Sequence, residues 1–300
     1  MRKLFYIALI AAAAFSSGAA DRKDALRRSL GTYSSPPRLA NGRVDCKELI
    51  NQLIDLRANC YSFAIHRAET DWDDLKIFLP MAREKHLRVW ASLVPPSESP
   101  PRTTAYSEPF RLDYERWAIE FAKLSLQESN LVGWSIDDFP YNIKFFTPEK
   151  MKSILDGARA INPNFAFVPC VYFKQITPVF IKQYIPLFDG ILFPYRNDSH
   201  GGDLKDPTHV DEEVKSIRDR LGKNYPIIVD IYFTAHSRLG ASTADYCEKA
   251  TIGAHDSGDG VQVYTHQDPV KNADKYQIIK KLFTKWSNKQ SGIVASPRSK

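Results

Sequence analysis

Short apolar runs alternate with amphipathic stretches eight times along this chain, and this alternation limits the possible folds most strongly. Such alternation is typical of a parallel α/β fold, because each return to a parallel strand needs a crossover helix. Eight units in 300 residues favour a closed (β/α)8 TIM barrel in a single domain over an open sheet. We interpret these runs as strands: 30–34, 58–65, 87–94, 131–137, 166–173, 190–195, 227–233 and 260–265.

The stretches between these runs carry helix signals. Thr147-Pro148 and Thr177-Pro178 each place an N-cap threonine before a proline at the first helical position. Apolar residues at helical spacing predict the other helices. The predicted ranges are 44–56, 72–85, 112–127, 148–160, a helix that begins at 178, 243–254 and 273–286.

The two ends of the chain differ from the barrel pattern. Residues 1–20 have a charged start, an apolar run and small residues before Asp21, which predicts a secretory signal peptide and a secreted or periplasmic protein. The apolar run is too short for stable membrane insertion. We therefore expect a charged leader at 21–29, the barrel at 30–287 and a disordered tail at 288–300.

Charge and cysteine usage exclude some classes of function. The formal net charge is +6, of which Arg2 and Lys3 of the signal contribute two, leaving +4. No basic motif with interleaved aromatics is present, which argues against a nucleic-acid partner. The four cysteines fall on separate predicted strands and helices without a CxxC pair, so we expect free, buried thiols.

The carboxyl ends of the strands should carry the active site, as in other barrel enzymes. His66, His236 and His266 lack a characteristic zinc spacing, so we predict no metal, and nothing in the sequence calls for a cofactor. For Arg67 and Arg196, pairing with Asp137 or Asp230 is favoured over pairing with a substrate carboxylate. We expect substrate contacts from Tyr33, His66, Arg67, Tyr141, Tyr172, Tyr195, Arg196, Asp230, Tyr232, Tyr264 and His266.

The end of the fourth predicted strand carries two adjacent acids, Asp137 and Asp138. The period of two puts Gly133, Ser135 and Asp137 on the face toward the barrel axis. On the same basis Val132, Trp134 and Ile136 should meet the helices. Two carboxylates this close cannot both ionise freely, so one pKa should rise, as acid catalysis requires. The alternative, that the pair caps the next helix, is disfavoured because that helix has its own cap at Thr147.

This double aspartate resembles the site of glycoside hydrolases that use substrate assistance. The nearest pattern is that of the β-N-acetylglucosaminidases that include O-GlcNAcase, and the chitinase and hexosaminidase families are more distantly similar. Pro169-Cys170-Val171-Tyr172 resembles the Pro-x-x-Tyr of those β-N-acetylglucosaminidases. Asp230-Ile231-Tyr232 resembles their Asp-Asn-Tyr, with Ile231 where they carry a sugar-binding Asn.

The resemblance implies roles for these residues. Asp137 would orient the 2-acetamido group of the substrate, whose carbonyl attacks the anomeric carbon. Asp138 would protonate the leaving oxygen and then activate water. Tyr172, Asp230 and Tyr232 would hold the sugar, and no metal or cofactor would take part.

The residues alone leave other functions open. Either Asp137 or Asp138 serves as the acid in a conventional two-carboxylate glycosidase, with Asp230 across the mouth as base or nucleophile. A carbohydrate-binding barrel without turnover is a further alternative. In each case the expected partner is an oligosaccharide, a polysaccharide or a glycoconjugate.

Overall fold

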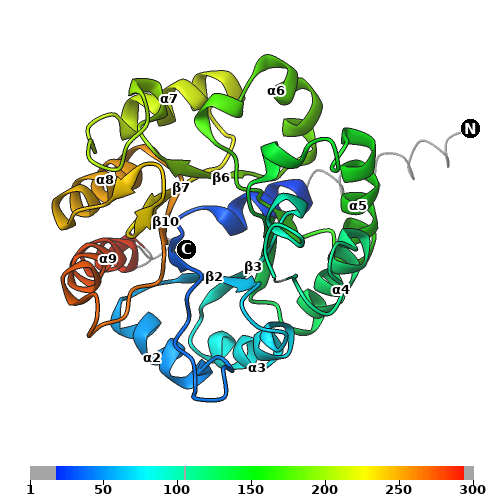
Figure 1. Cartoon of the computed structure of the whole chain (residues 1–300), viewed down its shortest axis with the longest axis horizontal. Helices are drawn as coiled ribbons and strands as arrows, with labels where there is room; N and C mark the ends of the chain where they lie inside the picture. The colour runs from blue at the N-terminus through cyan, green and yellow to red at the C-terminus, as the bar shows by residue number, and fades with distance from the viewer. Residues whose placement is uncertain (1–17, 105, 294–300) are drawn as a thin grey trace, which may run out of the picture.

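The computed structural model describes residues 18–104 and 106–293, which form the predicted (β/α)8 barrel. All eight predicted strands are present, and neighbouring strands pair in parallel. Figure 1 shows the strands at the centre of a ring of helices. The barrel strands are β1 (Leu30–Tyr33), β2 (Cys60–Ile65), β3 (Arg88–Leu93), β4 (Leu131–Ile136), β5 (Ala166–Phe167), β6 (Ile191–Tyr195), β7 (Ile227–Tyr232) and β10 (Gly260–Tyr264).

The barrel closes between β5 and β6. The sheet runs in the order β5-β4-β3-β2-β1-β10-β7-β6, and a parallel bridge between Cys170 and Leu192 joins its two edges. Val171 donates to the Leu192 carbonyl and Leu192 donates to the Pro169 carbonyl, both at 2.9 Å. β5 is much shorter than the predicted 166–173, although the amides of Val168 and Cys170 still donate to the carbonyls of Trp134 and Ile136 on β4.

The helices cover the outside of the barrel in sequence order (Figure 1). Thr147 and Thr177 accept bonds from the amides three residues on, as their cap motifs predicted. The sequence analysis missed α7, whose twelve residues are mostly charged and bury only one face. The helices are α2 (Cys46–Asp55), α3 (Asp71–Glu84), α4 (Tyr114–Gln127), α5 (Pro148–Ile161), α6 (Pro178–Tyr184), α7 (Val210–Leu221), α8 (Ala244–Ser257) and α9 (Ala273–Ile293).

The hydrophobic core has two layers. The larger layer lies between the strands and the helices, and Trp134 belongs to it together with Phe121 and Phe167. The smaller layer fills the barrel and consists of Leu26, Cys60, Trp90, Ala166, Val168, Leu192 and Ile228. Val132 contacts this inner layer instead of the helices, because a register irregularity at the start of β4 turns it around.

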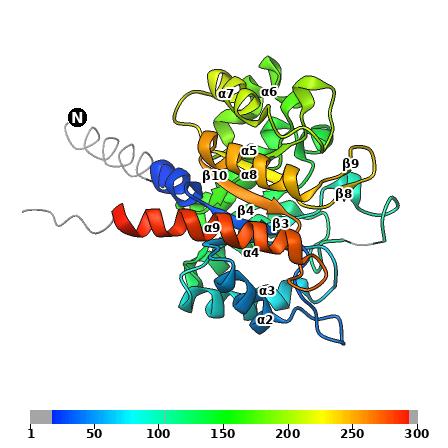
Figure 2. The same cartoon turned by 90° about the vertical axis from the view of Figure 1, so that its left-hand side faces the viewer.

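The leader is part of the fold. Residues 18–26 are helical and lie at the end of the barrel opposite the small hairpin β8 (Ala235–His236) and β9 (Gly240–Ala241), as Figure 2 shows. Arg22 pairs with Asp189 at 2.7 Å and Leu26 is fully buried in the inner layer. The leader therefore closes the bottom of the barrel.

The last helix runs past the predicted end of the barrel. α9 continues to Ile293, whereas the sequence placed the boundary between barrel and tail at 287. Most of the predicted signal peptide and residues 294–300 lie outside the described residues. Within the described ranges, no helix is long and apolar enough to cross a membrane. The four cysteines are free and buried, as predicted.

Candidate active site

A cavity of about 230 Å³ lies at the carboxyl ends of the strands, where the sequence placed the active site. Seven of the predicted site residues line it together: Tyr33, Asp137, Asp138, Tyr172, Asp230, Tyr232 and Tyr264. They come from β1, β4, β7 and β10 and from the segment after β5. Convergence of residues from so many strands is the usual construction of a barrel active site.

Asp137 directly follows β4 and points into this cavity. Its amide donates to the Leu93 carbonyl at 3.1 Å, which continues the ladder by one residue. Tyr33 donates to the Asp137 carboxylate at 3.2 Å, and the Asp138 amide donates to its other oxygen at 3.0 Å. Burial and the neighbouring Asp138 charge raise the pKa of Asp137 to about 6. This agrees with the expectation that one member of the pair has a raised pKa.

Asp138 occupies a sharp turn that brings its side chain to the same cavity. Its φ of 44° is left-handed, a conformation that aspartate tolerates better than most residues. The 3₁₀ turn η2 (Phe139–Asn142) follows, and Asn142 donates to the Asp138 carbonyl at 2.9 Å. Tyr172 donates a hydrogen bond to the Asp138 carboxylate. The turn and the tyrosine fix this carboxylate at the mouth.

Glu98 is a third acid of this site, and the sequence analysis did not identify it. It ends the 3₁₀ turn η1 (Pro96–Glu98), which follows β3 and is tied to η2 by Asn142 through bonds to Ser97 of 2.9 Å. Burial, the charges of Asp137 and Asp138, and a hydrogen bond with Asp138 raise the pKa of Glu98 to about 7. Its position just after a strand end was the signal that could have revealed it.

Asp230 lies deeper in the cavity than the other acids. Its side chain is buried, and one of its carboxyl oxygens has no hydrogen-bond partner. Burial, followed by the charge of Asp137, raises its pKa well above the ordinary range. Burial therefore favours the neutral form of the Asp230 carboxyl, whereas a base or nucleophile has to be ionised.

Tyrosine rings form the walls of the cavity. Tyr264 contacts Tyr33 and Tyr232, with ring centroids 5.3 and 5.4 Å apart. Tyr172 stands opposite, and the guanidinium of Arg196 lies 3.9 Å from its ring centroid. Flat rings of this kind suit the apolar faces of sugars.

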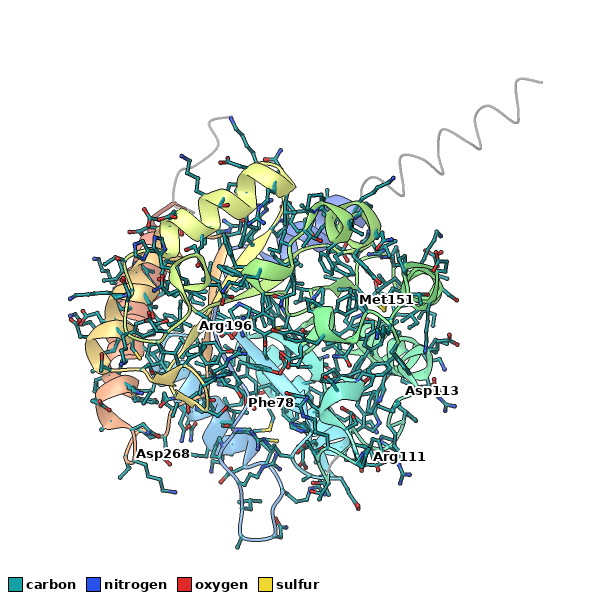
Figure 3. The ribbon with its side chains drawn as sticks, turned by 45° about the horizontal axis from the view of Figure 1, so that its top comes forward. Phe78, Arg111, Asp113, Met151, Arg196 and Asp268 are labelled. Carbon is teal, nitrogen blue, oxygen red and sulfur yellow. The ribbon has the colours of Figure 1, made fainter. Side chains whose placement is uncertain are left out.

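Neither arginine forms an ion pair with Asp137 or Asp230 within the described residues. Arg196 pairs with Asp198 at 2.9 Å, so the favoured pairing with Asp137 or Asp230 is wrong for this residue. Arg196 packs against the ring of Tyr172. Figure 3 shows Arg196 toward the centre of the barrel, whereas Asp113 and Met151 lie among the outer helices. Arg67 is exposed and forms no ion pair within the described residues.

Besides His66 and the two arginines, three predicted contact residues do not line this cavity. Tyr195 is fully buried and donates to the Asp206 carbonyl at 2.8 Å, because its neighbour Pro194 takes the inward position on β6. Its prediction as a substrate contact is therefore wrong. His266 is buried between Thr32 and Gln52, and burial lowers its pKa to about 4. Tyr141 is 51% exposed at the rim, with its ring 5.6 Å from that of Tyr172.

Two further hollows adjoin the cavity. His66 and Arg67 line a recess of about 50 Å³ that shares Glu98, Asp137 and Tyr264 with the main cavity. Arg67 and Tyr264 also line a groove of about 890 Å³ that extends toward Lys271 and Lys275. The three hollows share Tyr264 and therefore adjoin one another at the mouth of the barrel.

The site also has one group with metal-ligand spacing. Asp137, Asp138 and Cys170 each offer an atom within 4.8 Å of the others. Burial and the nearby carboxylates raise the pKa of the Cys170 thiol well above its ordinary value, so it is a protonated thiol and a poor ligand. The three strand-end histidines do not form such a group among the described residues.

Among the comparisons with known proteins, only the one with solved structures found similar proteins. No protein-family model matches the chain, and no curated protein matches it. Its fold is similar to a beta-glucuronidase from Bacteroides uniformis, with 11% identity, a TM-score of 0.56, and coverage of 80% of this chain and 30% of that chain. A beta-galacturonidase from Eisenbergiella tayi has 10% identity and a TM-score of 0.57 over 86% of this chain and 51% of that chain.

A third similar structure is Cel5A of Thermotoga maritima, solved with cellobiose. It has 13% identity and a TM-score of 0.55, with coverage of 86% of this chain and 98% of that chain. The chain thus spans under a third of the Bacteroides enzyme and nearly all of Cel5A. The likeness establishes the barrel fold, and the function has to be argued from the site.

Proposed function

We propose that this protein is a glycoside hydrolase that cleaves N-acetylhexosaminides with the help of the substrate's own acetamido group. The observation that carries the proposal is the acid cluster at the end of β4, in which Asp138 contacts Glu98 and follows Asp137 directly. A cavity of about 230 Å³ walled by tyrosines supports binding of one sugar residue there. The similar solved structures are named for other sugars, so the acetamido specificity rests on the site alone.

The acids of the cavity do not suit a conventional pair of carboxylates. In such enzymes the two groups are about 5 to 9.5 Å apart, with the glycosidic bond between them. Glu98 and Asp138 are in hydrogen-bond contact, which is too close for that arrangement. Asp230 is deeply buried, and burial raises its pKa and favours the neutral carboxyl, which does not suit a base or nucleophile. A nucleophile supplied by the substrate removes the need for a second carboxylate.

The acids then divide the work. Asp137, ionised above about pH 6, accepts the acetamido N–H and increases the nucleophilicity of the carbonyl oxygen. That oxygen attacks the anomeric carbon while Asp138 delivers a proton to the leaving oxygen. Glu98 contacts Asp138 and has a pKa of about 7, so at neutral pH it holds a proton beside the Asp138 carboxylate. In the second step Asp138 takes a proton from a water molecule, and the attack of that water on the anomeric carbon opens the cyclic intermediate.

The adjoining groove supports an extended substrate. It is larger than the catalytic cavity and shares Tyr264 with it. We therefore propose an oligosaccharide, polysaccharide or glycoconjugate as the substrate, with the N-acetylhexosamine residue in the cavity. We also propose that the protein is exported, on the basis of the signal-like residues 1–20.

Hydrolysis of a panel of aryl glycosides tests the proposal. The panel comprises N-acetylglucosaminide, glucoside, galactoside and fucoside, assayed with wild type and Asp138→Asn. The matched control is Asp156→Asn, an exposed carboxylate on α5 that pairs with Lys152. We expect cleavage of the N-acetyl substrate, with kcat/KM reduced by about 100-fold or more in Asp138→Asn and unchanged in the control.

Two outcomes would contradict the proposal. Cleavage of a sugar without the acetamido group, and of no N-acetyl substrate, would keep the barrel and discard substrate assistance. Equal activity of wild type and Asp138→Asn would remove Asp138 from the catalytic role.

A further inference from the structure

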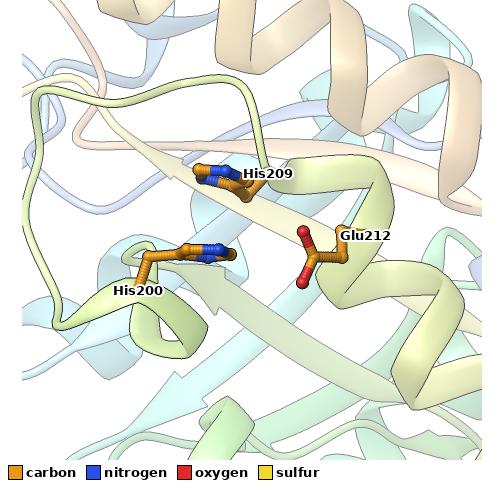
Figure 4. Close-up of side chains that lie close together, drawn as sticks. All are labelled: His200, His209 and Glu212. Carbon is orange, nitrogen blue, oxygen red and sulfur yellow. The ribbon is translucent and has the colours of Figure 1, made fainter.

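Two histidines and a glutamate cluster on the surface of the β6–α7 connection, away from the acid cluster. The rings of His200 and His209 are stacked, with centroids 3.6 Å apart and planes inclined by 11°. One ligand atom of each histidine and of Glu212 lies within 4.8 Å of the others. Figure 4 shows the two parallel rings with the Glu212 carboxylate facing their edges.

The local backbone explains this arrangement. His200 ends the 3₁₀ turn η5 (Asp198–His200), and His209 is the residue that caps the start of α7. Glu212 follows His209 by three residues, so the two side chains lie on the same face of the helix. Segment 201–208 makes a loop that returns η5 to α7. The cluster therefore joins the two ends of one loop.

The hydrogen bonds of the rings determine which nitrogens are free. Nδ1 of His209 lies 3.1 Å from the Asn197 amide oxygen and 3.4 Å from an Asp206 carboxylate oxygen. Both are acceptors, so Nδ1 of His209 carries the hydrogen. Nδ1 of His200 lies 2.9 Å from Ser199 Oγ, whose own hydrogen goes to Glu213 at 2.8 Å. Nδ1 of His200 is therefore also a donor.

With both Nδ1 atoms donating, each neutral ring presents the lone pair of Nε2. A histidine that binds a metal through one nitrogen usually donates the other N–H to an oxygen acceptor, and that arrangement is already present here for both rings. Buried Glu213 and Asn197 belong to this supporting layer. The cluster thus has two free imidazole nitrogens and one carboxylate, held by partners of the right kind.

We propose that His200, His209 and Glu212 bind a zinc ion, or a divalent transition metal of similar preference, that ties η5 to α7. Two imidazoles and a carboxylate suit Zn²⁺, with water in the fourth tetrahedral position. Ligand atoms around tetrahedral zinc are about 3.3 Å apart, so the three groups, which lie within 4.8 Å of one another, need to close only slightly when the ion binds. The ion makes the loop more rigid and has no part in the proposed hydrolysis.

The proposal is tested with the full chain, produced without a histidine tag and freed of metal with a chelator. ZnSO₄ is titrated by calorimetry, and CoCl₂ by visible absorption, which reports tetrahedral coordination. The variants are His209→Ala and Glu212→Gln. The control is His86→Asn, an exposed histidine with φ of 57°, a conformation that Asn accepts.

We expect one equivalent of Zn²⁺ to bind wild type and the control, with Tm raised by about 5 °C at 100 times Kd. Binding should be lost in His209→Ala and weakened at least 10-fold in Glu212→Gln, while both keep the metal-free Tm of wild type within about 2 °C. Absence of binding to wild type at 1 mM Zn²⁺ (about the limit of a weak site) would overturn the proposal. Equal binding by wild type and His209→Ala would also overturn it, since the ion would then lie elsewhere.

Discussion

The substitution Glu98→Gln tests whether the proton on Glu98 sets the alkaline limit of activity. Glutamine keeps the size of the side chain and its contact with Asp138 but does not titrate. In wild type the pKa of Glu98 is raised from 4.5 to about 7, and that of Asp137 from 3.8 to about 6. The proposed mechanism requires an ionised Asp137 and a protonated Glu98. We therefore expect a bell-shaped dependence of kcat/KM on pH, with limbs near 6 and 7.

The size of the effect follows from these values. Glu98 loses its proton as pH rises through about 7 in wild type, because burial and the two aspartate charges raise its pKa to that value. Glu98→Gln removes this titrating group, so the alkaline limb should move down by at least about one pH unit. Each unit is a tenfold change in protonated fraction, so kcat/KM at pH 7 should fall about 10-fold or more.

The assay is the pH profile of kcat/KM on an aryl N-acetylglucosaminide, from pH 4.5 to about 9. Glu108→Gln is a suitable control, because Glu108 lies in the same loop and pairs with Arg111 instead of an aspartate. An alkaline limb that stays near 7 in Glu98→Gln would refute the reasoning. In that case another group would hold the proton.

Three other predictions follow from burial. Asp230→Asn should keep kcat/KM within about 10-fold of wild type, because burial raises the pKa of Asp230 and favours the neutral carboxyl that the amide resembles. A role as base or nucleophile would bring a far larger loss. Asp137→Asn should raise Tm by about 5 °C at pH 8. The raised pKa of Asp137 gives stability that is present below pH 3.8 and lost as pH rises through about 6. The difference in Tm between Asp137→Asn and wild type should therefore vanish near pH 3.5. An equal difference in Tm at pH 8 and pH 3.5 would contradict the prediction. Leu26→Ala should lower the free energy of unfolding, measured in urea titrations, by about 2 to 5 kcal/mol. The control Leu126→Ala, at a side chain that is 61% exposed, should lower it by under about 0.5 kcal/mol. Equal losses would mean that the leader does not close the barrel.

Local sequence patterns were sufficient to predict the fold. Each barrel strand was marked by a short apolar run, and the threonine–proline pairs marked two helix starts correctly. α7 was missed because its charged residues hide a narrow apolar face. The leader was taken for a separate segment, since burial of Leu26 depends on contacts with residues more than thirty positions away.

The site was predictable where the alternation of residues along a strand decides whether a side chain points into the barrel or away from it. Period two placed Asp137 in the mouth correctly, and the same rule explains why Tyr195 points outward, since Pro194 is the inward residue. Glu98 was missed because its position depends on the bonds of Asn142 to the η1 turn, which link segments 45 residues apart. Likewise, the alternation of residues along a strand does not predict that Arg196 pairs with Asp198 after the end of β6.

The most direct test of the central claim is calorimetric binding of a thiazoline analogue of N-acetylglucosamine, which mimics the cyclic intermediate of acetamido assistance. Wild type and Asp137→Asn should be compared at pH 7, where the wild-type carboxylate is largely ionised. The account predicts binding to wild type and at least about 10-fold weaker binding to Asp137→Asn, because the charge that polarises the ring nitrogen is lost. No binding to wild type, or equal binding by both proteins, would contradict it.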